Sequence, residues 1–268
     1  MEYDEGNQLL TIDLKLGGIK LQELAEFSDV KIIRLNNCEN QIKLPTEFKS
    51  FKNLHSIYCY ARLDYNYECP ANVELFSQLR HLKLWSGCDL ESIPKLLTIE
   101  NLEIVICDPS KDTEVLIPKF PALKKLVLRG SVNENKILSS RICEFKELVD
   151  LSLISCGLSS LPKEIKLLKA LKKIELNRLD FTQFPKELCE MSWLETISFH
   201  NHLIELPEKL SNLTNLKELN LSRVFNFGTT EPVEDLSGNT VKMNPIPTVL
   251  SKLSSLESLN LDFCGRKW

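Results

Sequence analysis

The chain of 268 residues is 43% hydrophobic and 26% charged, and its formal net charge is −4. A nucleic-acid or anionic-membrane partner requires a concentrated basic surface, so this acidic balance argues against both. No apolar run approaches the ~18 residues that a membrane helix needs, and we therefore expect no membrane insertion.

An apolar phrase recurs along the chain about every 23 residues. Each copy reads apolar-x-x-apolar-x-apolar, and the clear copies, such as Leu148 to Leu168, continue into apolar-x-x-Leu-Pro-x-x-apolar-x-x-apolar. Self-similarity at a short fixed period is typical of a solenoid, in which each unit buries its apolar residues against its neighbours. The spacings run from 21 to 25 residues, with a last spacing of 40, between eleven starts at Leu9, Val30, Leu54, Leu79, Leu102, Leu123, Leu148, Leu171, Leu194, Leu216 and Leu256.

Two elements are expected in every copy. The first half alternates with period 2, which predicts a short strand with one buried face. The proline that follows fixes φ and has no amide hydrogen, so it suits the first turn of a helix. Strands on one side and tighter helical turns on the other predict a curved stack with a concave parallel sheet.

This phrase resembles the leucine-rich repeat family across essentially the whole chain. The resemblance implies an α/β solenoid, or horseshoe, with a concave parallel β-sheet and short helical or 3-10 outer segments. It also implies one domain, residues 1–268, of about eleven repeats. The Leu-Pro-x-x-Ile/Leu-x-x-Leu ending is similar to a subclass of roughly 23 residues found in intracellular scaffold and Ras-binding proteins, plant intracellular proteins and bacterial proteins. That family usually places Asn or Cys at the turn after the strand; here Asn is missing from it, His202 stands there in one copy, and four other copies have Cys38, Cys88, Cys156 and Cys264.

The nine cysteines indicate buried, reduced thiols and a cytoplasmic location. The count is odd, and neither a C-x-x-C pair nor a cysteine cluster at the ends suggests disulfide caps. Cys69 alone falls in an irregular stretch, so we expect it to be the most accessible thiol in the native protein.

Catalytic and cofactor motifs are missing from the sequence. There is no glycine-rich phosphate loop, and no nucleophile stands beside a positioned histidine. His200 and His202 form a pair, but in strand register they face different environments, which disfavours zinc. We therefore predict no enzyme activity, no metal and no cofactor.

The strand register predicts the concave surface, because the third, fifth and seventh residues of each copy face it. The first half of that surface is apolar, aromatic and basic, whereas the second half is polar and acidic. Tyr, Trp and Arg are enriched at binding hot spots. We therefore expect a partner-binding patch made of Tyr58, Tyr60, Lys83, Trp85, Ile104, Ile106, Val127 and Arg129. The alternative is that these rings only pack on one another and shield the sheet.

The spacing of 40 residues leaves an insertion at about 225–245, which we expect to project from the rim of the solenoid. The final copy ends directly after its strand, so the last strand would fray, be covered by the insertion, or pair with another chain. We favour cover by the insertion, and self-association through this C-terminal edge stays open.

Our leading hypothesis is a non-catalytic scaffold that binds an unidentified protein on its concave face. One alternative is the sensor or targeting segment of a larger signalling enzyme or effector, such as a kinase, NTPase or ubiquitin ligase. Another is an exported cell-surface adhesin whose signal peptide was removed.

Overall fold

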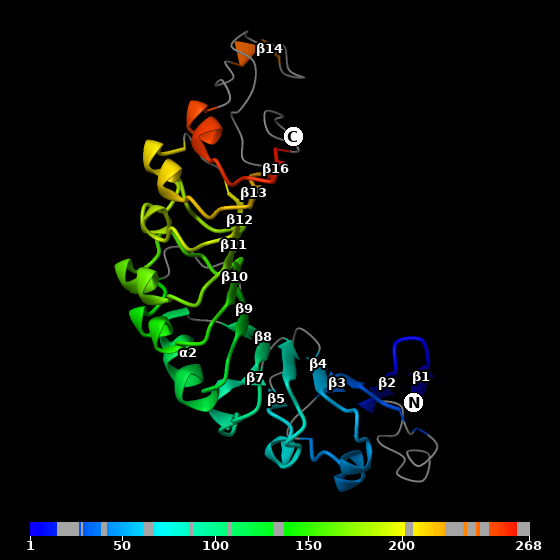
Figure 1. The fold of residues 1–268 in the computed structure, drawn as a ribbon. Coiled ribbons are helices and arrows are strands. Elements are labelled where there is room, and N and C mark those ends of the chain that lie inside the picture. The colour runs from blue at the N-terminus through cyan, green and yellow to red at the C-terminus, as the bar shows by residue number, and fades with distance from the viewer. Residues whose placement is uncertain are drawn as a thin grey trace. The chain divides into compact units, whose positions relative to one another are not determined.

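The computed structural model describes residues 1–14, 27, 29–38, 42–61, 67–85, 88–106, 109–130, 137–201, 206–222, 233–234, 240–241 and 247–261. The chain forms two compact units. The first comprises Met1–Cys107 and Lys111–Arg129, and the second comprises Asp108–Ser110 and Gly130–Trp268. In each unit, strands stand side by side and short helical segments lie on the opposite side of the repeats (Figure 1).

The first unit is built on strands that follow one another in chain order. They are β1 (Glu2–Asp4), β2 (Leu9–Asp13), β3 (Ile32–Cys38), β4 (Ser56–Ala61), β6 (His81–Trp85), β8 (Asn101–Ile106) and β9 (Lys125–Gly130). β1 is antiparallel to β2, while β2, β3, β4, β6 and β8 pair in parallel. A small parallel pair joins β5 (Tyr67–Glu68) to β7 (Cys88–Asp89). The outer segments are η2 (Thr46–Ser50), η3 (Val73–Leu75), η4 (Leu90–Ser92), α2 (Pro109–Leu116) and η5 (Ile117–Lys119).

The second unit repeats the same plan with more regular copies. Its parallel strands are β10 (Asp150–Ile154), β11 (Lys173–Asn177), β12 (Thr196–His200), β13 (Glu218–Asn220) and β16 (Ser258–Asn260). Its outer segments are η6 (Ser140–Glu144), η7 (Lys163–Leu167), η8 (Leu188–Glu190), η9 (Glu208–Asn212) and η10 (Thr248–Lys252). A short antiparallel pair, β14 (Val233–Glu234) with β15 (Thr240–Val241), lies within the predicted insertion. The rest of that insertion lies outside the described residues.

The core comes from the alternation that the sequence predicts. In β11 the side chains of Ile174 and Leu176 are fully buried, and in β12 those of Ile197 and Phe199 are too. The parallel register places Ile174 beside Ile197 and Leu176 beside Phe199. Successive strands lie about 4.8 Å apart, so apolar side chains at equivalent repeat positions pack on one another through the core. This confirms the repeat solenoid and its parallel sheet.

The prolines begin 3-10 turns, as the outer segments of the sequence lead us to expect. Pro162 precedes η7 with φ −64°, and its carbonyl accepts a hydrogen bond from the amide of Ile165 at 3.0 Å. Ile165 and Leu168 are fully buried. A 3-10 helix has fewer residues per turn than an α-helix. The outer segment of each copy can therefore complete its turn with few residues.

The turn after the strand differs from the prediction in one copy. Asn201 follows β12 directly, is 4% exposed, and bonds to the preceding copy. Its Oδ1 accepts from the amide of Leu179 at 2.6 Å, and its Nδ2 donates to the carbonyl of Leu176 at 3.0 Å. Asn201 therefore makes the bond to a backbone amide that the family's turn residue makes, one place before His202, which is outside the described residues.

The register of β8 also differs from the prediction. Leu102 pairs with Leu82, and Ile104 pairs with Leu84, so both occupy buried strand positions. The copy therefore begins at Ile99 rather than Leu102, three residues earlier. An odd shift exchanges the two faces of a strand, which changes the predicted binding patch.

Seven cysteines lie in the described part of the chain, and all seven are buried thiols that form no disulfide there: Cys38, Cys59, Cys69, Cys88, Cys143, Cys156 and Cys189. Cys69 is 1% exposed, so the expectation that it is the accessible thiol was wrong. Its backbone amide donates to Ser92 Oγ at 2.7 Å, which holds the irregular stretch against the next copy. Burial raises the pKa of Cys69, and it raises the pKa of Cys143 and of Cys189 to about 11.

These thiols should react slowly in the native protein, since burial shields all seven from the reagent and, in Cys69, Cys143 and Cys189, also disfavours the reactive thiolate. A thiol reagent should modify all nine cysteines in denaturant without prior reduction, and modification of the seven described ones should be slow in native buffer. Mass spectrometry of the modified peptides measures both. A disulfide in freshly purified native protein, or rapid native labelling of Cys69, would contradict this prediction.

Candidate functional site

The sheet of the first unit presents an open face, which we define as the side chains that alternate with the buried strand residues. The parallel register aligns these side chains into rows that cross the strands. One row reads Thr11, Arg34, Tyr58, Lys83 and Glu103, and the next reads Asp13, Asn36, Tyr60 and Trp85. Neighbours in a row stand on strands about 4.8 Å apart, so long side chains reach one another across the face.

Two aromatic rings form the centre of this face. The ring centroids of Tyr60 and Trp85 are 5.5 Å apart, with the planes inclined by 34°. Lys83 Nζ lies 4.5 Å from the Trp85 ring centroid and 5.9 Å from that of Tyr60. Arg129 also lies over Trp85, at 5.7 Å. These distances suit cation–π attraction, which holds the rings between positive charges.

Glu103 links the two cations that flank Trp85. Its carboxylate accepts from Lys83 Nζ at 2.9 Å and from Arg129 Nε at 2.7 Å, and its side chain is 23% exposed. Burial alone would raise the pKa of Glu103, but the hydrogen bonds from Lys83 and Arg129 outweigh burial and lower it. The carboxylate is therefore ionised at neutral pH and fixes both cations in place.

Arg34 lies on the other side of Tyr60. Its guanidinium carbon is 5.7 Å from the Tyr60 ring centroid. Its Nε is buried and has no hydrogen-bond partner among the described residues. We refer to Arg34, Tyr60, Lys83, Trp85, Glu103 and Arg129 together as the aromatic–cation cluster.

The structure brings five of the eight predicted patch residues together: Tyr58, Tyr60, Lys83, Trp85 and Arg129. Ile104 is fully buried in the core, so its assignment to the patch was wrong. Val127 is only 8% exposed and contributes little surface. Ile106 ends β8, and its side chain lies outside the described residues.

Glu103 was missed, although it completes the cluster. In the predicted register Glu103 is the second residue of its copy and is not among the third, fifth and seventh residues that face the open side. The observed register, with Leu102 and Ile104 buried, brings it to the open face. Arg34 was not part of the predicted patch, and one strand, β4, separates it from Trp85 on β6. The cation–π contact with Tyr60 connects it to the rest.

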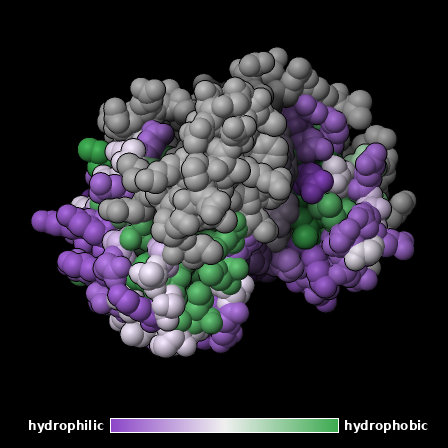
Figure 2. Space-filling model, turned by 90° about the horizontal axis from the view of Figure 1, so that it is seen from above, coloured by the Kyte–Doolittle hydropathy of each residue, from purple (hydrophilic) through white to green (hydrophobic). Residues whose placement is uncertain are grey.

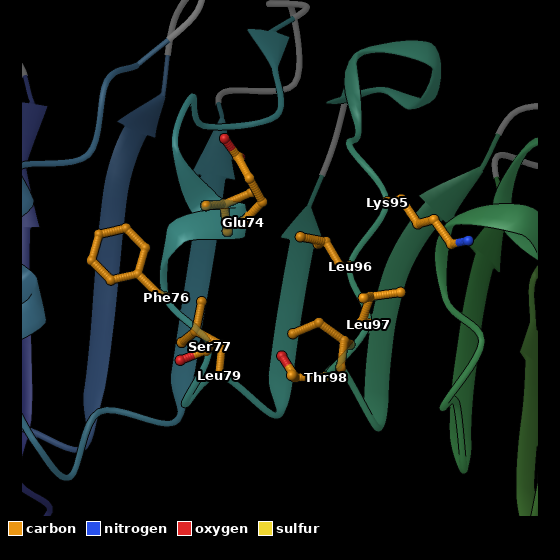
Figure 3. Close-up of a pocket in the computed structure, with 10 residues that line it drawn as sticks. Glu74, Phe76, Ser77, Leu79, Lys95, Leu96, Leu97 and Thr98 are labelled. Atoms are coloured by element: carbon orange, nitrogen blue, oxygen red, sulfur yellow. The ribbon is translucent and has the colours of Figure 1, made fainter.

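The outer side of the first unit contains a pocket of about 190 Å³. Figure 3 shows Phe76 and Leu79 of one copy with Leu96 and Leu97 of the next around it. The outer segment that begins at Pro94 is short. The next strand phrase starts at Ile99, and the full 3-10 turn that follows Pro162 in a regular copy is missing here. The missing turn accounts for the pocket and for the 62% exposure of Leu97.

Neither metal ligands nor membrane helices mark another site in the described part of the chain. No group of three or more His, Cys, Asp and Glu residues there could hold a metal ion. None of the helices described is long and apolar enough to cross a membrane. Hydrophilic residues cover most of the described surface in Figure 2, and hydrophobic residues gather in a few groups.

Comparison with known proteins gives distant relatives. No family model matches the chain. The TMV resistance protein N of Nicotiana glutinosa is 27% identical over 211 residues, which cover 73% of this chain and 18% of that protein. The probable inactive serine/threonine-protein kinase roco10 of Dictyostelium discoideum is 32% identical over 121 residues, covering 43% of this chain and 4% of that protein. The chain therefore spans less than a fifth of the length of these curated relatives.

Solved structures show the same fold at low sequence identity. A leucine-rich repeat protein of Leptospira interrogans superimposes with a TM-score of 0.56 at 22% identity, covering 96% of this chain and 72% of that one. The TLR13–ssRNA13 complex gives a TM-score of 0.55 at 15% identity, covering 96% of this chain and 39% of that one. At these identities the likeness concerns the fold and not the ligand.

Proposed function

We propose that this chain, which has the fold of leucine-rich repeat proteins, binds a protein partner through the open face of its first unit, without catalysing a reaction. Repeat solenoids of this kind present extended surfaces on which side chains can change without disturbing the core. The roughly 23-residue subclass and the cytoplasmic location remain predictions. So does the organisation as one domain of about eleven repeats with an insertion at about 225–245.

The aromatic–cation cluster is the observation that supports this proposal. Trp85 is 37% exposed, yet Lys83 and Arg129 stack against it, and Glu103 holds both cations. An aromatic ring that is already fixed in the free protein loses little conformational entropy on binding. Exposed aromatic residues in such surroundings are the residues that carry most of the free energy at protein interfaces.

Replacing Trp85 with alanine should weaken binding of the partner by about 2 kcal/mol or more, and Tyr60→Ala should act in the same direction. The partner can be obtained by crosslinking mass spectrometry with wild-type bait, and its affinity measured by calorimetry. Lys173→Ala is a matched control, since Lys173 is exposed on β11 in the second unit. Thermal unfolding should stay close to wild type in all three variants.

Equal affinity for that partner in the wild type and in both aromatic variants would remove the cluster from the interface. Turnover of a substrate by the purified chain would contradict the non-catalytic assignment.

A second candidate function is the sensor or targeting segment of a larger signalling enzyme or effector. The lengths of the curated relatives favour this function. The chain matches only 18% and 4% of two of them, so those proteins are many times longer than the matched region. The complete reading frame of the gene tests it, and a catalytic domain in the same frame would support it. An exported adhesin would instead show a signal peptide in that frame.

Self-association through the C-terminal edge also remains a prediction. Leu259 in β16 occupies the same register position as Leu219 in β13, yet Leu259 is 41% exposed and Leu219 is buried. β16 is the last strand of the sheet among the described residues, and an unpaired strand edge is a template for pairing with a second copy.

A further inference from the structure

We propose that the partner segment presents a carboxylate to Arg34 and an apolar side chain to Tyr60 and Trp85, so that the open face recognises an acidic, apolar peptide. The inference rests on the proposed function and assigns Arg34 as the residue that determines its specificity. It follows from how the charges of the aromatic–cation cluster are distributed.

The cluster contains three cations and one carboxylate. Glu103 forms ion pairs with both Lys83 and Arg129. Arg34 forms no ion pair and no side-chain hydrogen bond among the described residues. Asp13, at a diagonal register position on β2, accepts a hydrogen bond from Asn37 Nδ2 at 2.9 Å. Among the described residues, Arg34 is therefore the cation of the cluster that has no carboxylate in direct contact.

Arg34 is half-buried, and Nε is the only guanidinium nitrogen of this residue among the buried unpaired atoms of the described residues. A guanidinium binds a planar carboxylate through two parallel N–H···O bonds, and its two terminal amino groups can form that fork from the open face. A carboxylate from a partner would supply acceptors that the described residues do not give to Arg34. The Tyr60 ring beside the guanidinium limits its freedom and holds it ready.

Nucleic acid also combines negative charge with rings that stack on aromatic side chains, but the cluster suits it poorly. Single strands follow a track of cations, one phosphate after another. Here Glu103 occupies the space between Lys83 and Arg129 and would repel a phosphate at that point. One unpaired cation beside an apolar pair of rings fits a carboxylate on a peptide better.

The register also sets the spacing within the peptide. Arg34 on β3 and Trp85 on β6 are separated by β4, which places them roughly 10 Å apart across the sheet. An extended peptide covers that distance in about three residues. The preferred segment therefore carries Asp or Glu about three positions from a large apolar side chain.

The test is selection from a display library of random peptides about a dozen residues long, on the whole chain. Wild-type protein, Arg34→Gln, Arg34→Glu, Trp85→Ala and the control Lys173→Gln are each used as bait. The wild type and Lys173→Gln should enrich Asp or Glu at the stated spacing from Leu, Phe or Trp. Arg34→Glu should enrich Lys or Arg at the same place.

Synthetic peptides from the wild-type selection then give affinities. Arg34→Gln should weaken an acidic peptide by at least about ten-fold, as expected for a charged hydrogen-bonded pair. Changing the acidic residue of the peptide to its amide should weaken binding to the wild type by the same factor. The same change should cause no further loss of affinity for Arg34→Gln. Amidating the peptide's C-terminus distinguishes a terminal carboxylate from a side-chain one, because only the former would then lose affinity.

The outcomes separate this inference from the proposed function. Peptides that need Trp85 but bind Arg34→Gln as tightly as the wild type would overturn the inference and leave the interface in place. Selected peptides that bind Trp85→Ala and Arg34→Gln unchanged would overturn both. A single-stranded oligouridylate that binds more tightly than every selected peptide and requires Arg34 would replace the peptide with RNA.

Discussion

Replacing Asn201 with leucine is expected to destabilise the second unit by about 2–4 kcal/mol. The side chain is almost completely buried and bonds to two backbone groups of the preceding copy, the amide of Leu179 and the carbonyl of Leu176. Leucine has similar size but neither donor nor acceptor. Both backbone groups would stay buried without partners, and each such group costs about 1–3 kcal/mol.

Asn201→Asp separates the two bonds, because the carboxylate keeps the acceptor and loses the donor. At neutral pH we expect it to destabilise the second unit at least as much as Asn201→Leu, because a buried negative charge would face the carbonyl oxygen of Leu176. Asn212→Ala is the control, since Asn212 is exposed at the end of η9 and should change stability by less than about 0.5 kcal/mol. Urea unfolding measures all three, and a loss below about 0.5 kcal/mol in Asn201→Leu would show that the two bonds contribute little.

Gly130→Ala is expected to cost about 1–3 kcal/mol, and Gly130→Val more. A Cβ at Gly130 would lie 2.6 Å from the Cα of Cys156 and 2.6 Å from the carbonyl oxygen of Ser155. Both contacts are with backbone, which cannot move aside as a flexible side chain can. The end of β9 and the turn that contains Ser155 and Cys156 would have to move apart, which would loosen the packing of that turn.

Gly6→Ala is the matched control, because a Cβ there meets only Asp4 Oδ1, at 3.4 Å. Circular dichroism during heating should show a lower Tm for the Gly130 variants and little change for Gly6→Ala. Equal Tm values for Gly130→Ala and Gly6→Ala would contradict the close backbone approach.

Much of the fold could be predicted because burial in a strand has a period of 2. The alternation at Leu151 and Leu153 or at Ile174 and Leu176 states directly which side chains enter the core. The prolines located the outer turns for a similar reason, since Pro162 restricts its own backbone whatever surrounds it. Such local constraints leave little choice to tertiary packing.

The register of β8 could not be predicted in this way, because two alignments satisfy the same phrase. Apolar residues occupy the required positions in both alignments, Ile99-x-x-Leu102-x-Ile104 and Leu102-x-x-Val105-x-Cys107. A constant spacing of about 23 residues favours the second, but the outer segment after Pro94 is shorter than usual. Only packing against Leu82 and Leu84 decides between them.

The candidate site was predicted in part for the same reason. Tyr58, Tyr60, Lys83 and Trp85 lie in copies whose register is unambiguous, and the structure brings them together. Contacts between copies, such as the ion pairs of Glu103, depend on which residues face each other across strands. A repeat phrase contains no such information until every register is known.

The separation of open-face residues from buried ones has a consequence for how this protein can change over evolutionary time. Lys83 and Trp85 alternate with Leu82 and Leu84 on one strand, so the two sets can mutate independently. Substitutions in one set alter which molecules are recognised, while the other set preserves folding. A duplicated gene could therefore acquire a new ligand through a few codon changes on β3, β4 and β6, without passing through an unfolded intermediate. The same property makes these positions suitable for a randomised library in binder engineering.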